Sequence, residues 1–320
     1  MIKYPMKLNY VAKTAIWGGT VLKKEWGKSC EFDKLAETFE LTVRDNAVSA
    51  IQNGEYNGLS LSEYLHNTPD AMGEKTTEDG RFPLLVKLID AADDLSVQVH
   101  PDNEYAKKEN DLGKTEMWYV ISAEPGAKLV YGLADYMDEN DFRSSVALGQ
   151  TEKAVKSVSV HAGECYFIPS GLVHAIGKGC LIAEIQQNSD VTYRVYDYDR
   201  RDAMGNPREL HVQKALDVVR AFSEQELHAL RFSRFPKLSC GECLAACEYF
   251  EVHLLSLSGF SEKLCAEGDS FHSLLCIEGN GSVIYGGVHY PISRGDSYFL
   301  PAGMGEYTLC GNAKILLSRI

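Results

Sequence analysis

A nine-residue block of this sequence occurs twice, and it constrains the fold more than any other feature. The first copy, residues 163–171, reads GECYFIPSG, and the second, residues 295–303, reads GDSYFLPAG. Seven of the nine positions are identical or similar, and the copies lie 132 residues apart. Solenoid units recur every ~20–50 residues, so this longer spacing indicates duplication of a whole domain. The chain is therefore predicted to contain two related domains.

Most of the remaining pattern is typical of β-structure. Short alternating segments are separated by Gly, Pro and Asp, which favours strands joined by turns. The clearest predicted strands are residues 95–100, 116–122, 165–169, 181–187 and 191–197. Helices are predicted at residues 60–66, where Ser60 and Glu63 form a capping-box pattern, and at residues 209–222, with a further capped start at Ser223. We expect a mainly β protein with a small helical segment.

The repeat and the helical segment together divide the chain. We assign residues 1–205 to a first domain with inserted helices and residues 206–235 to a helical linker. Residues 236–320 then form the second domain. A chain of this length can bury a large core without disulfides.

Charge and cysteine content exclude several classes of protein. The chain has 32 Lys and Arg against 45 Asp and Glu, a net charge of -13, which disfavours nucleic acid as a partner. It has no apolar run of the ~20 residues that a membrane helix requires. The first seven residues resemble no signal peptide, and nine cysteines form an odd number that favours a reducing compartment. We therefore expect a cytoplasmic protein that has no membrane partner.

Polar side chains alternate along the predicted strand at residues 95–100. A period of two places Ser96, Gln98 and His100 on one face and the apolar Leu95, Val97 and Val99 on the other. Polar groups inside a barrel need partners, because burying them unpaired costs roughly 1–3 kcal/mol each. The pattern fits either a metal or polar ligand inside the fold or a face that points to solvent.

Two further residues extend this pattern into a candidate metal site. Glu116 opens an apolar strand, where an unpaired carboxylate would be costly, and His174 follows a Pro-Ser-Gly turn. With His100 they make a set of two His and one Glu from three strands. Such a set suits a catalytic zinc with an open position, and it equally suits the facial triad of non-haem iron.

Arg194 and Asp190 mark a second group of interest. Arg194 lies in a Tyr-rich strand, and its planar guanidinium suits an anion site because it binds phosphate and stays charged. An alternative is that Arg194 forms a salt bridge with Asp197 or Asp199. The residues alone leave both readings open.

The repeated block resembles a motif of the cupin superfamily. Its form is G-x5-P-x-G, and in the first copy it continues to His174, as in the second cupin motif. The second copy has no His at that position. The resemblance implies two jelly-roll domains from an internal duplication. The first would carry the metal, and the second would be a degenerate barrel without one.

The whole chain also resembles type I mannose-6-phosphate isomerase in its short bacterial form. The shared segments, in order, are WGG (17–19), SVQVHP (96–101), GKTE (113–116), PSGLVHA (169–175), DVTYR (190–194) and RELH (208–211). The resemblance implies one zinc per chain, interconversion of mannose 6-phosphate and fructose 6-phosphate, and a sugar phosphate as partner. The implied zinc ligands are His100, Glu116, His174 and Gln98. The implied catalytic residues are Arg194, Lys114 and Asp190, and the expected substrate contacts are Ser96, Lys114, Arg194 and Trp17.

The implied chemistry suits these residues. Moving a carbonyl between two sugar carbons passes through a cis-enediolate, whose developing charge needs preorganised positive groups. Zinc with one carboxylate and neutral ligands keeps a charge of about +1, and Lys114 with Arg194 adds to it. Lys114, Asp190 or a zinc-bound water remain as candidates for the base. The alternatives are a cupin iron oxygenase and a sugar-binding cupin without activity, and the oligomeric state is not predicted.

Other conspicuous residues receive structural interpretations. Cys240, Cys243 and Cys247 are spaced closely enough for a metal cluster, but no second pair follows them, so structural thiols are favoured. His253 and His272 lack neighbours at ligand spacing and are expected to be structural. Lys87 precedes the metal residues by one hairpin and is a weaker candidate for facing the site.

Overall fold

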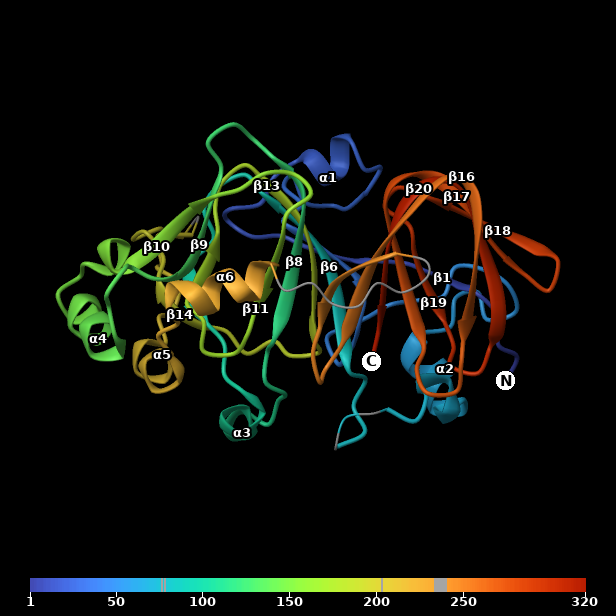
Figure 1. Cartoon of the computed structure of the whole chain (residues 1–320), viewed down its shortest axis with the longest axis horizontal. Coiled ribbons are helices and arrows are strands. Elements are labelled where there is room, and N and C mark those ends of the chain that lie inside the picture. Colours follow the sequence, from blue (N-terminus) through green and yellow to red (C-terminus); the bar gives the residue numbers. More distant parts are fainter. Residues whose placement is uncertain (76, 78, 203, 233–240) are drawn as a thin grey trace.

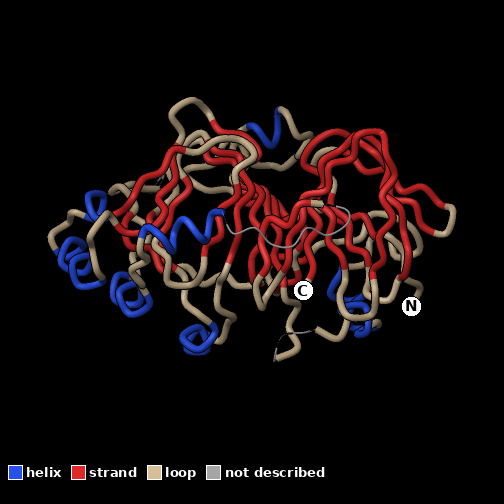
Figure 2. Tube along the Cα trace, in the orientation of Figure 1, coloured by secondary structure: helices blue, strands red, loops and turns tan. Residues whose placement is uncertain are grey.

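The computed structural model describes residues 1–320 except 76, 78, 203 and 233–240 (Figure 1). Strands dominate it and the helices are short, so the predicted mainly β class is confirmed. Figure 2 shows the strands gathered into two groups that meet in the middle of the molecule. The first group comes from residues 11–196, and the second comes from residues 242–319 together with the first strand of the chain.

The N-terminal group consists of two larger sheets and a small hairpin. The six-stranded sheet has the order β11 (Cys165–Ile168), β8 (Glu116–Ala123), β13 (Cys180–Gln187), β6 (Leu84–Ala91), β3 (Glu37–Leu41) and β2 (Val11–Lys13). The five-stranded sheet has the order β10 (Val155–Ser159), β9 (Lys128–Leu133), β12 (His174–Ile176), β7 (Val97–Val99) and β14 (Tyr193–Tyr196). The hairpin pairs β4 (Val43–Arg44) with β5 (Ala47–Val48).

The strands β6 and β13 are buried along their entire length, so both of their faces lie in cores. On one face of β13, Ile182 packs in a cluster with Trp118 and Leu129, between the two N-terminal sheets. On the other face, Leu181 and Ile185 pack against residues of the C-terminal sheet. Strands buried on both faces read as nearly continuous apolar runs, as residues 181–185 do. Polar residues in such a strand therefore require a specific partner.

The C-terminal group is one long, curved sheet. Its path is β1 (Met6–Leu8), β19 (Ser297–Leu300), β17 (His272–Tyr285), β20 (Gly305–Arg319), β16 (Glu251–Ala266) and β15 (Glu242–Ala246), with β18 (Val288–Ser293) paired to β17. Bulges interrupt the registers of β16 and β17 with β20, and bulges bend strands. The sheet encloses its own cluster, which includes Leu274, Tyr298 and Leu317.

The two copies of the repeated block have the same local structure. Gly163 and Gly295 both have φ of 89°, a left-handed conformation that glycine adopts without strain. Each donates a backbone hydrogen bond of 2.8 Å to the neighbouring strand, at Val120 and Cys276 respectively. The order β11-β8-β13-β6 is matched by β19-β17-β20-β16. This match is what a duplication requires and supports it, while the duplication itself stays a prediction.

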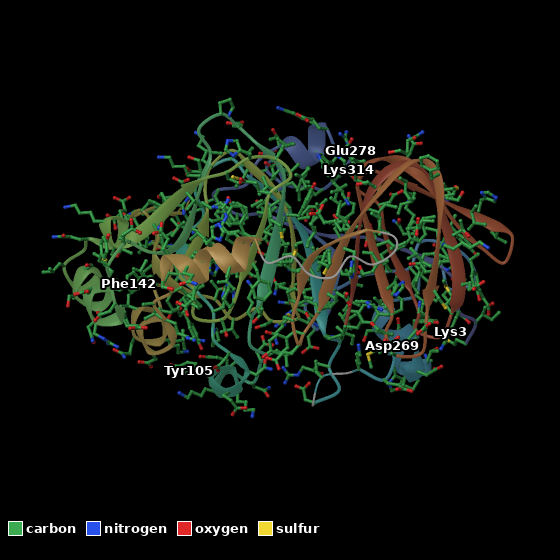
Figure 3. The ribbon with its side chains drawn as sticks, viewed as in Figure 1. Lys3, Tyr105, Phe142, Asp269, Glu278 and Lys314 are labelled. Carbon is green, nitrogen blue, oxygen red and sulfur yellow. The ribbon has the colours of Figure 1, made fainter. Side chains whose placement is uncertain are left out.

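The N-terminal segment reaches across the predicted domain limits. Strand β1 pairs with β19, so it belongs to the C-terminal sheet although it lies within residues 1–205. Lys3 Nζ donates to Ala302 O at 2.6 Å and to Asp70 Oδ2 at 2.7 Å (Figure 3). Asp70 belongs to the short 3-10 helix Pro69–Met72. The limits at residues 205 and 235 remain predictions, and residue 235 lies outside the described part of the chain.

The helices lie at the edges of the sheets. They are α1 (Val21–Lys24), α2 (Leu61–Asn67), α3 (Asn103–Ala106), α4 (Glu139–Ala147), α5 (Val212–Val218) and α6 (Glu224–Phe232). The capping box of Ser60 and Glu63 at α2 is confirmed. The expected helix at residues 209–222 is wrong in extent, because Val219 turns to extended backbone and Arg220 N donates to Gly171 O. None of the described helices is long and apolar enough to cross a membrane.

A buried ion pair joins the two strand groups. Lys28 Nζ lies 2.7 Å from Glu40 Oε1 and donates to Gly295 O at 2.7 Å, at the start of the second copy of the block. The two side chains are 4% and 1% exposed, so the pair is desolvated. Thr38 Oγ1 donates a further hydrogen bond of 2.6 Å to the same carboxylate.

We predict that Lys28→Ala lowers the free energy of unfolding by about 3–5 kcal/mol, because it leaves Glu40 buried without its counter-charge. Urea denaturation measures the change. The exposed neighbour Lys24→Ala is the matched control, expected to alter stability by less than about 0.5 kcal/mol. A loss below about 1 kcal/mol for Lys28→Ala would show that the pair does not hold the two groups together.

Candidate metal centre

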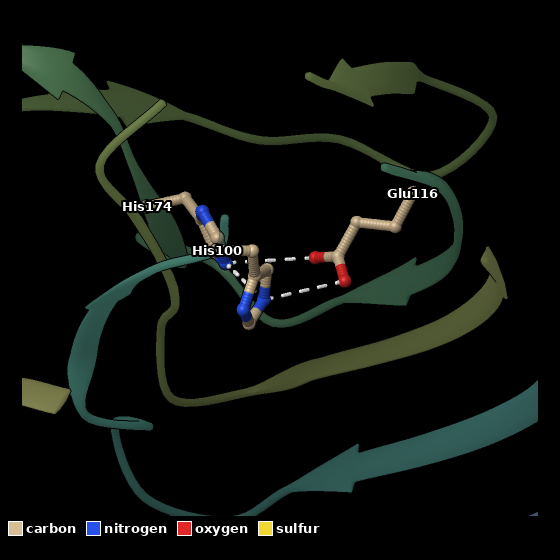
Figure 4. A group of neighbouring side chains, drawn as sticks. All are labelled: His100, Glu116 and His174. Carbon is tan, nitrogen blue, oxygen red and sulfur yellow. Dashed lines mark hydrogen bonds and ion pairs between the residues drawn. The ribbon is translucent and has the colours of Figure 1, made fainter. Parts of the chain in front are cut away.

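We call the two larger N-terminal sheets the N-terminal barrel and the curved C-terminal sheet the C-terminal barrel. Three of the predicted metal ligands converge inside the N-terminal barrel. His100 follows β7, Glu116 begins β8 and His174 begins β12, and each side chain is at most 1% exposed. The Nε2 atoms of His100 and His174 lie 3.1 Å apart, and each lies 3.5 Å from one oxygen of Glu116 (Figure 4). The structure thus brings together His100, Glu116 and His174 from separate strands, as the sequence predicted.

Backbone carbonyls fix the orientation of both imidazoles. His100 Nδ1 lies 2.9 Å from Val191 O, and His174 Nδ1 lies 2.8 Å from Leu172 O. A carbonyl oxygen only accepts, so each Nδ1 carries the proton and each Nε2 presents a lone pair. Burial lowers the pKa of His174 to about 4 and the pKa of His100 well below its usual value. Both rings are therefore neutral ligands with their free nitrogen directed at one point.

The same geometry is unfavourable unless a cation is present. Neither oxygen of Glu116 has a hydrogen-bond partner among the described residues, although the carboxylate is fully buried. Its nearest counter-charge is Lys114 Nζ, at 3.4 Å. Burial raises the pKa of Glu116, and the charge of Glu184 adds to this effect. Two lone pairs and one underpartnered carboxylate fit a metal ion, which would satisfy all three groups.

Gln98 adjoins the three ligands. It is paired with His174 across the β7–β12 register, and its side-chain Nε2 lies 3.4 Å from His174 Nε2. Amide oxygen and nitrogen are assigned from the surrounding network, so a rotation of the amide turns the oxygen toward the same point. Val97 and Val99 pack on the opposite face of the strand, which confirms the predicted alternation there.

A charged pair lies beside these ligands, formed by Lys87, which the sequence offered as a weaker candidate, and Glu184, which it did not single out. Lys87 Nζ lies 2.9 Å from Glu184 Oε1, and Trp118 Nε1 donates to the other oxygen at 2.9 Å. Burial opposes the charge of Glu184, but Lys87 outweighs it and lowers the pKa of this carboxyl. Glu37 is a further acid in this electrostatic neighbourhood. In the sequence, Glu184 could have been identified as the one carboxylate within the apolar run of residues 181–185.

Arg194 is held toward the strand that carries the ligands. Its Nε donates to Ser96 Oγ at 3.2 Å, and its Nη1 donates to Glu209 O at 2.8 Å. Asp197, the alternative partner, is instead bonded by Arg200 and Arg208. Neutral oxygens therefore position the Arg194 guanidinium, and its role at an anion site remains a prediction.

Two predicted site residues lie elsewhere. Trp17 is buried in the core cluster that also contains Ile89 and Trp118. Asp190 is exposed, and its backbone nitrogen donates to Asp111 Oδ2 at 3.2 Å. Neither belongs to the group of ligand atoms, so their roles in substrate binding and catalysis remain predictions.

Comparison with known families accords with this site. Residues 6–145 match the phosphomannose isomerase type I catalytic domain, and residues 242–320 match the mannose-6-phosphate isomerase cupin domain. Mannose-6-phosphate isomerase ManA of Bacillus subtilis is 38% identical over the full length of both chains. The chain belongs to the type I phosphomannose isomerase family.

Other members show the same extent of similarity. The mannose-6-phosphate isomerase of Streptococcus mutans is 35% identical, with 98% of each chain covered. The crystal structure of mannose 6-phosphate isomerase from Bacillus subtilis superposes with a TM-score of 0.88 at 34% identity, covering 99% of each chain. The family's fold therefore extends across this whole chain.

We predict opposite effects of Glu116→Gln on stability and on metal affinity. In a chelator the amide removes a buried, underpartnered charge, so the variant should be as stable as the parent or gain about 1–3 kcal/mol. Its affinity for a divalent ion should fall at least about tenfold, as losses at metal sites do. Thermal unfolding in chelator and in a metal titration measures both. A metal-free variant less stable than the parent would contradict the assignment of Glu116 as a ligand.

Proposed function

We propose that this chain interconverts mannose 6-phosphate and fructose 6-phosphate with one catalytic zinc ion. The observation that carries the proposal is the convergence of His100, Glu116 and His174, with Gln98 beside them, in a chain of the phosphomannose isomerase family. Two imidazoles and one carboxylate suit zinc. The same donors suit iron, so family membership favours zinc in this proposal.

The bound ion would supply a Lewis acid that polarises the sugar oxygens, with a net charge of about +1 after its single carboxylate ligand. The reaction removes a proton from a carbon next to the carbonyl and passes through a cis-enediolate on the sugar. In this proposal Lys114, 3.4 Å from Glu116, adds positive charge beside the developing anion. The base remains one of Lys114, Asp190 or a bound water.

Arg194 is proposed to hold the phosphate or the enediolate oxygens. Ser96 and the Glu209 carbonyl accept from two of its nitrogens and so fix the direction of the fork. A preorganised guanidinium loses little entropy on binding an anion. These contacts explain how a chain with a net charge of -13 would bind a sugar phosphate.

The domain roles follow the same proposal. Residues 1–205 would contain the catalytic barrel and residues 236–320 a barrel that takes no part in the chemistry. The eight described cysteines are all free, which suits the cytoplasm that we propose as the site of action.

Two alternatives make different predictions for solvent hydrogen. An isomerase that acts through an enediolate exchanges the hydrogen at sugar C1 or C2 with deuterium oxide, under anaerobic conditions. A cupin iron oxygenase consumes dioxygen, and a non-catalytic sugar-binding protein shows no exchange. Mass spectrometry of recovered fructose 6-phosphate therefore separates the three functions.

We predict that His174→Ala lowers turnover of fructose 6-phosphate at least about 100-fold, because loss of a ligand should cost more than loss of an outer partner. A coupled assay measures the rate, and elemental analysis should show less bound zinc. The exposed His289→Ala is the matched control and should keep both. Full activity in metal-free His174→Ala would refute a metal-dependent function.

Arg194→Ala is predicted to lower kcat about 10²–10³-fold, as removal of one transition-state donor does. Its zinc content should equal that of the parent, since Arg194 contacts Ser96 rather than a ligand. The control is Arg201→Ala, an exposed arginine that bonds to Gly205 O. If kcat/KM is unchanged in Arg194→Ala, the guanidinium has no part in the reaction.

A further inference from the structure

A second group of metal-binding side chains lies in the C-terminal barrel. Cys243 on β15 and Glu251 and His253 on β16 place one donor atom each within 4.8 Å of one another. The sequence favoured structural roles for Cys243 and His253, because no second cysteine pair follows Cys243 and because His253 has no neighbours at ligand spacing. Cys240, the other thiol considered with Cys243, lies outside the described residues.

The strand register explains why these residues meet. Cys243 is the cross-strand partner of His253, and directly paired residues on antiparallel strands share a face. Glu251 lies two residues before His253 and therefore points to the same side. Leu255 lies two residues after it and packs in the core of this barrel. The group is thus directed at the barrel interior, with Glu251 at its rim.

His253 has hydrogen-bonding capacity that the described residues leave unused. Its side chain is 0% exposed, its Nε2 lies 2.8 Å from Glu251 Oε1, and its Nδ1 has no hydrogen-bond partner among the described residues. If Nε2–H donates to the carboxylate, Nδ1 presents a buried lone pair. A metal ion would accept this lone pair. An unpaired buried nitrogen otherwise costs about 1–3 kcal/mol.

The group also lies where the first barrel has its charged centre. Ile168 and Leu300 are equivalent positions of the repeated block. The cross-strand partner of Ile168 is Glu116, and that of Leu300 is His272. His272 therefore corresponds to Glu116.

The correspondence extends across the next two strands. In the first barrel, Trp118 pairs with Glu184, and Glu184 pairs in turn with Lys87. In the second barrel, Leu274 pairs with Leu317, and Leu317 pairs in turn with His253. His253 thus takes the place of Lys87 beside the catalytic ligands. The second barrel keeps polar side chains at this position, although the histidine that follows the block is absent.

We propose that Cys243, Glu251 and His253 form a second cation site, for a thiophilic divalent ion such as Zn²⁺. In tetrahedral zinc sites the ligand atoms lie about 3.3–3.8 Å apart, given bond lengths of about 2.0–2.3 Å. From separations of up to 4.8 Å, the three donor atoms need to move toward one another by no more than about 1.5 Å. The site therefore requires small side-chain rotations and no change of strand register.

The proposed ligands have protein partners when no cation is bound. Arg319 Nη2 lies 2.8 Å from Glu251 Oε2, so the carboxylate has a partner when no ion is bound. Cys243 is buried, and a thiol gives up its proton when it binds a metal ion. Binding must then release a proton, which favours ions with high affinity for sulfur over Mg²⁺ or Ca²⁺.

Cobalt(II) tests the proposal, because a thiolate ligand gives it a charge-transfer absorption that the His–His–Glu centre cannot produce. We expect the chelator-stripped protein to bind two equivalents, one of them with this absorption. Cys243→Ser should bind one equivalent and lose the absorption. Cys247→Ser, a partly buried thiol nearby, is the matched control and should keep both.

His174→Ala separates this site from the catalytic one. It should keep one equivalent of cobalt together with the thiolate absorption, so it also carries the test if Cys243→Ser does not fold. With zinc at the catalytic site, Cys243→Ser should keep isomerase turnover within twofold of the parent. Binding of a single equivalent without the absorption in the parent, or an absorption that persists in Cys243→Ser, would overturn the proposal.

Discussion

Three buried groups that direct electron pairs at one point set the main constraint on this fold. The Nε2 atoms of His100 and His174 lie 3.1 Å apart, and no hydrogen bond from the described residues reaches either oxygen of Glu116. Such an arrangement opposes folding, because lone pairs repel and a buried carboxylate without hydrogen bonds is costly. It persists because carbonyls of Val191 and Leu172 hold the rings and because the strands that carry them are fixed by large apolar cores. Stability elsewhere offsets the strain of the site, which is the usual relation between a scaffold and a metal centre.

The second barrel contributes to that scaffold directly. The outer faces of β6 and β13 pack against the C-terminal sheet, and the inner face of β13 carries Glu184 toward the metal ligands. Without the C-terminal sheet, one face of β13 would be exposed to solvent, and fewer contacts would hold Glu184 in position. The crossing of β1 into the C-terminal sheet and the Lys28–Glu40 pair bind the two groups further. Contacts with the C-terminal sheet therefore help to hold the strands of the metal site in place.

The sequence was sufficient for features encoded over short distances. The repeated block, the capping box at Ser60 and the alternation around Gln98 all depend on neighbours within a few residues, and the structure agrees with each. Features that depend on strand pairing were out of reach. The Lys87–Glu184 pair joins residues 97 positions apart, and Cys243 meets His253 only through a particular register. The helix predicted to reach residue 222 ends early because a tertiary bond from Arg220 to Gly171 replaces its last turn. A one-residue change of register would reverse the facing of every such side chain, so spacing alone cannot identify these pairs.

Charge balance links the metal centre to the proposed anionic substrate. Lys87 and Lys114 lie in the same region as Glu37, Glu116 and Glu184, so these side chains alone supply no excess of positive charge. A divalent ion held by neutral imidazoles and one of these carboxylates would leave an excess of positive charge in this region. In a buried site of low dielectric such an excess acts strongly on a phosphate or an enediolate. Anion binding and metal binding are therefore thermodynamically coupled, and each should strengthen the other by the same factor. On this argument the two neutral histidines matter as much as the carboxylate, because every additional anionic ligand would remove part of the field that the substrate requires.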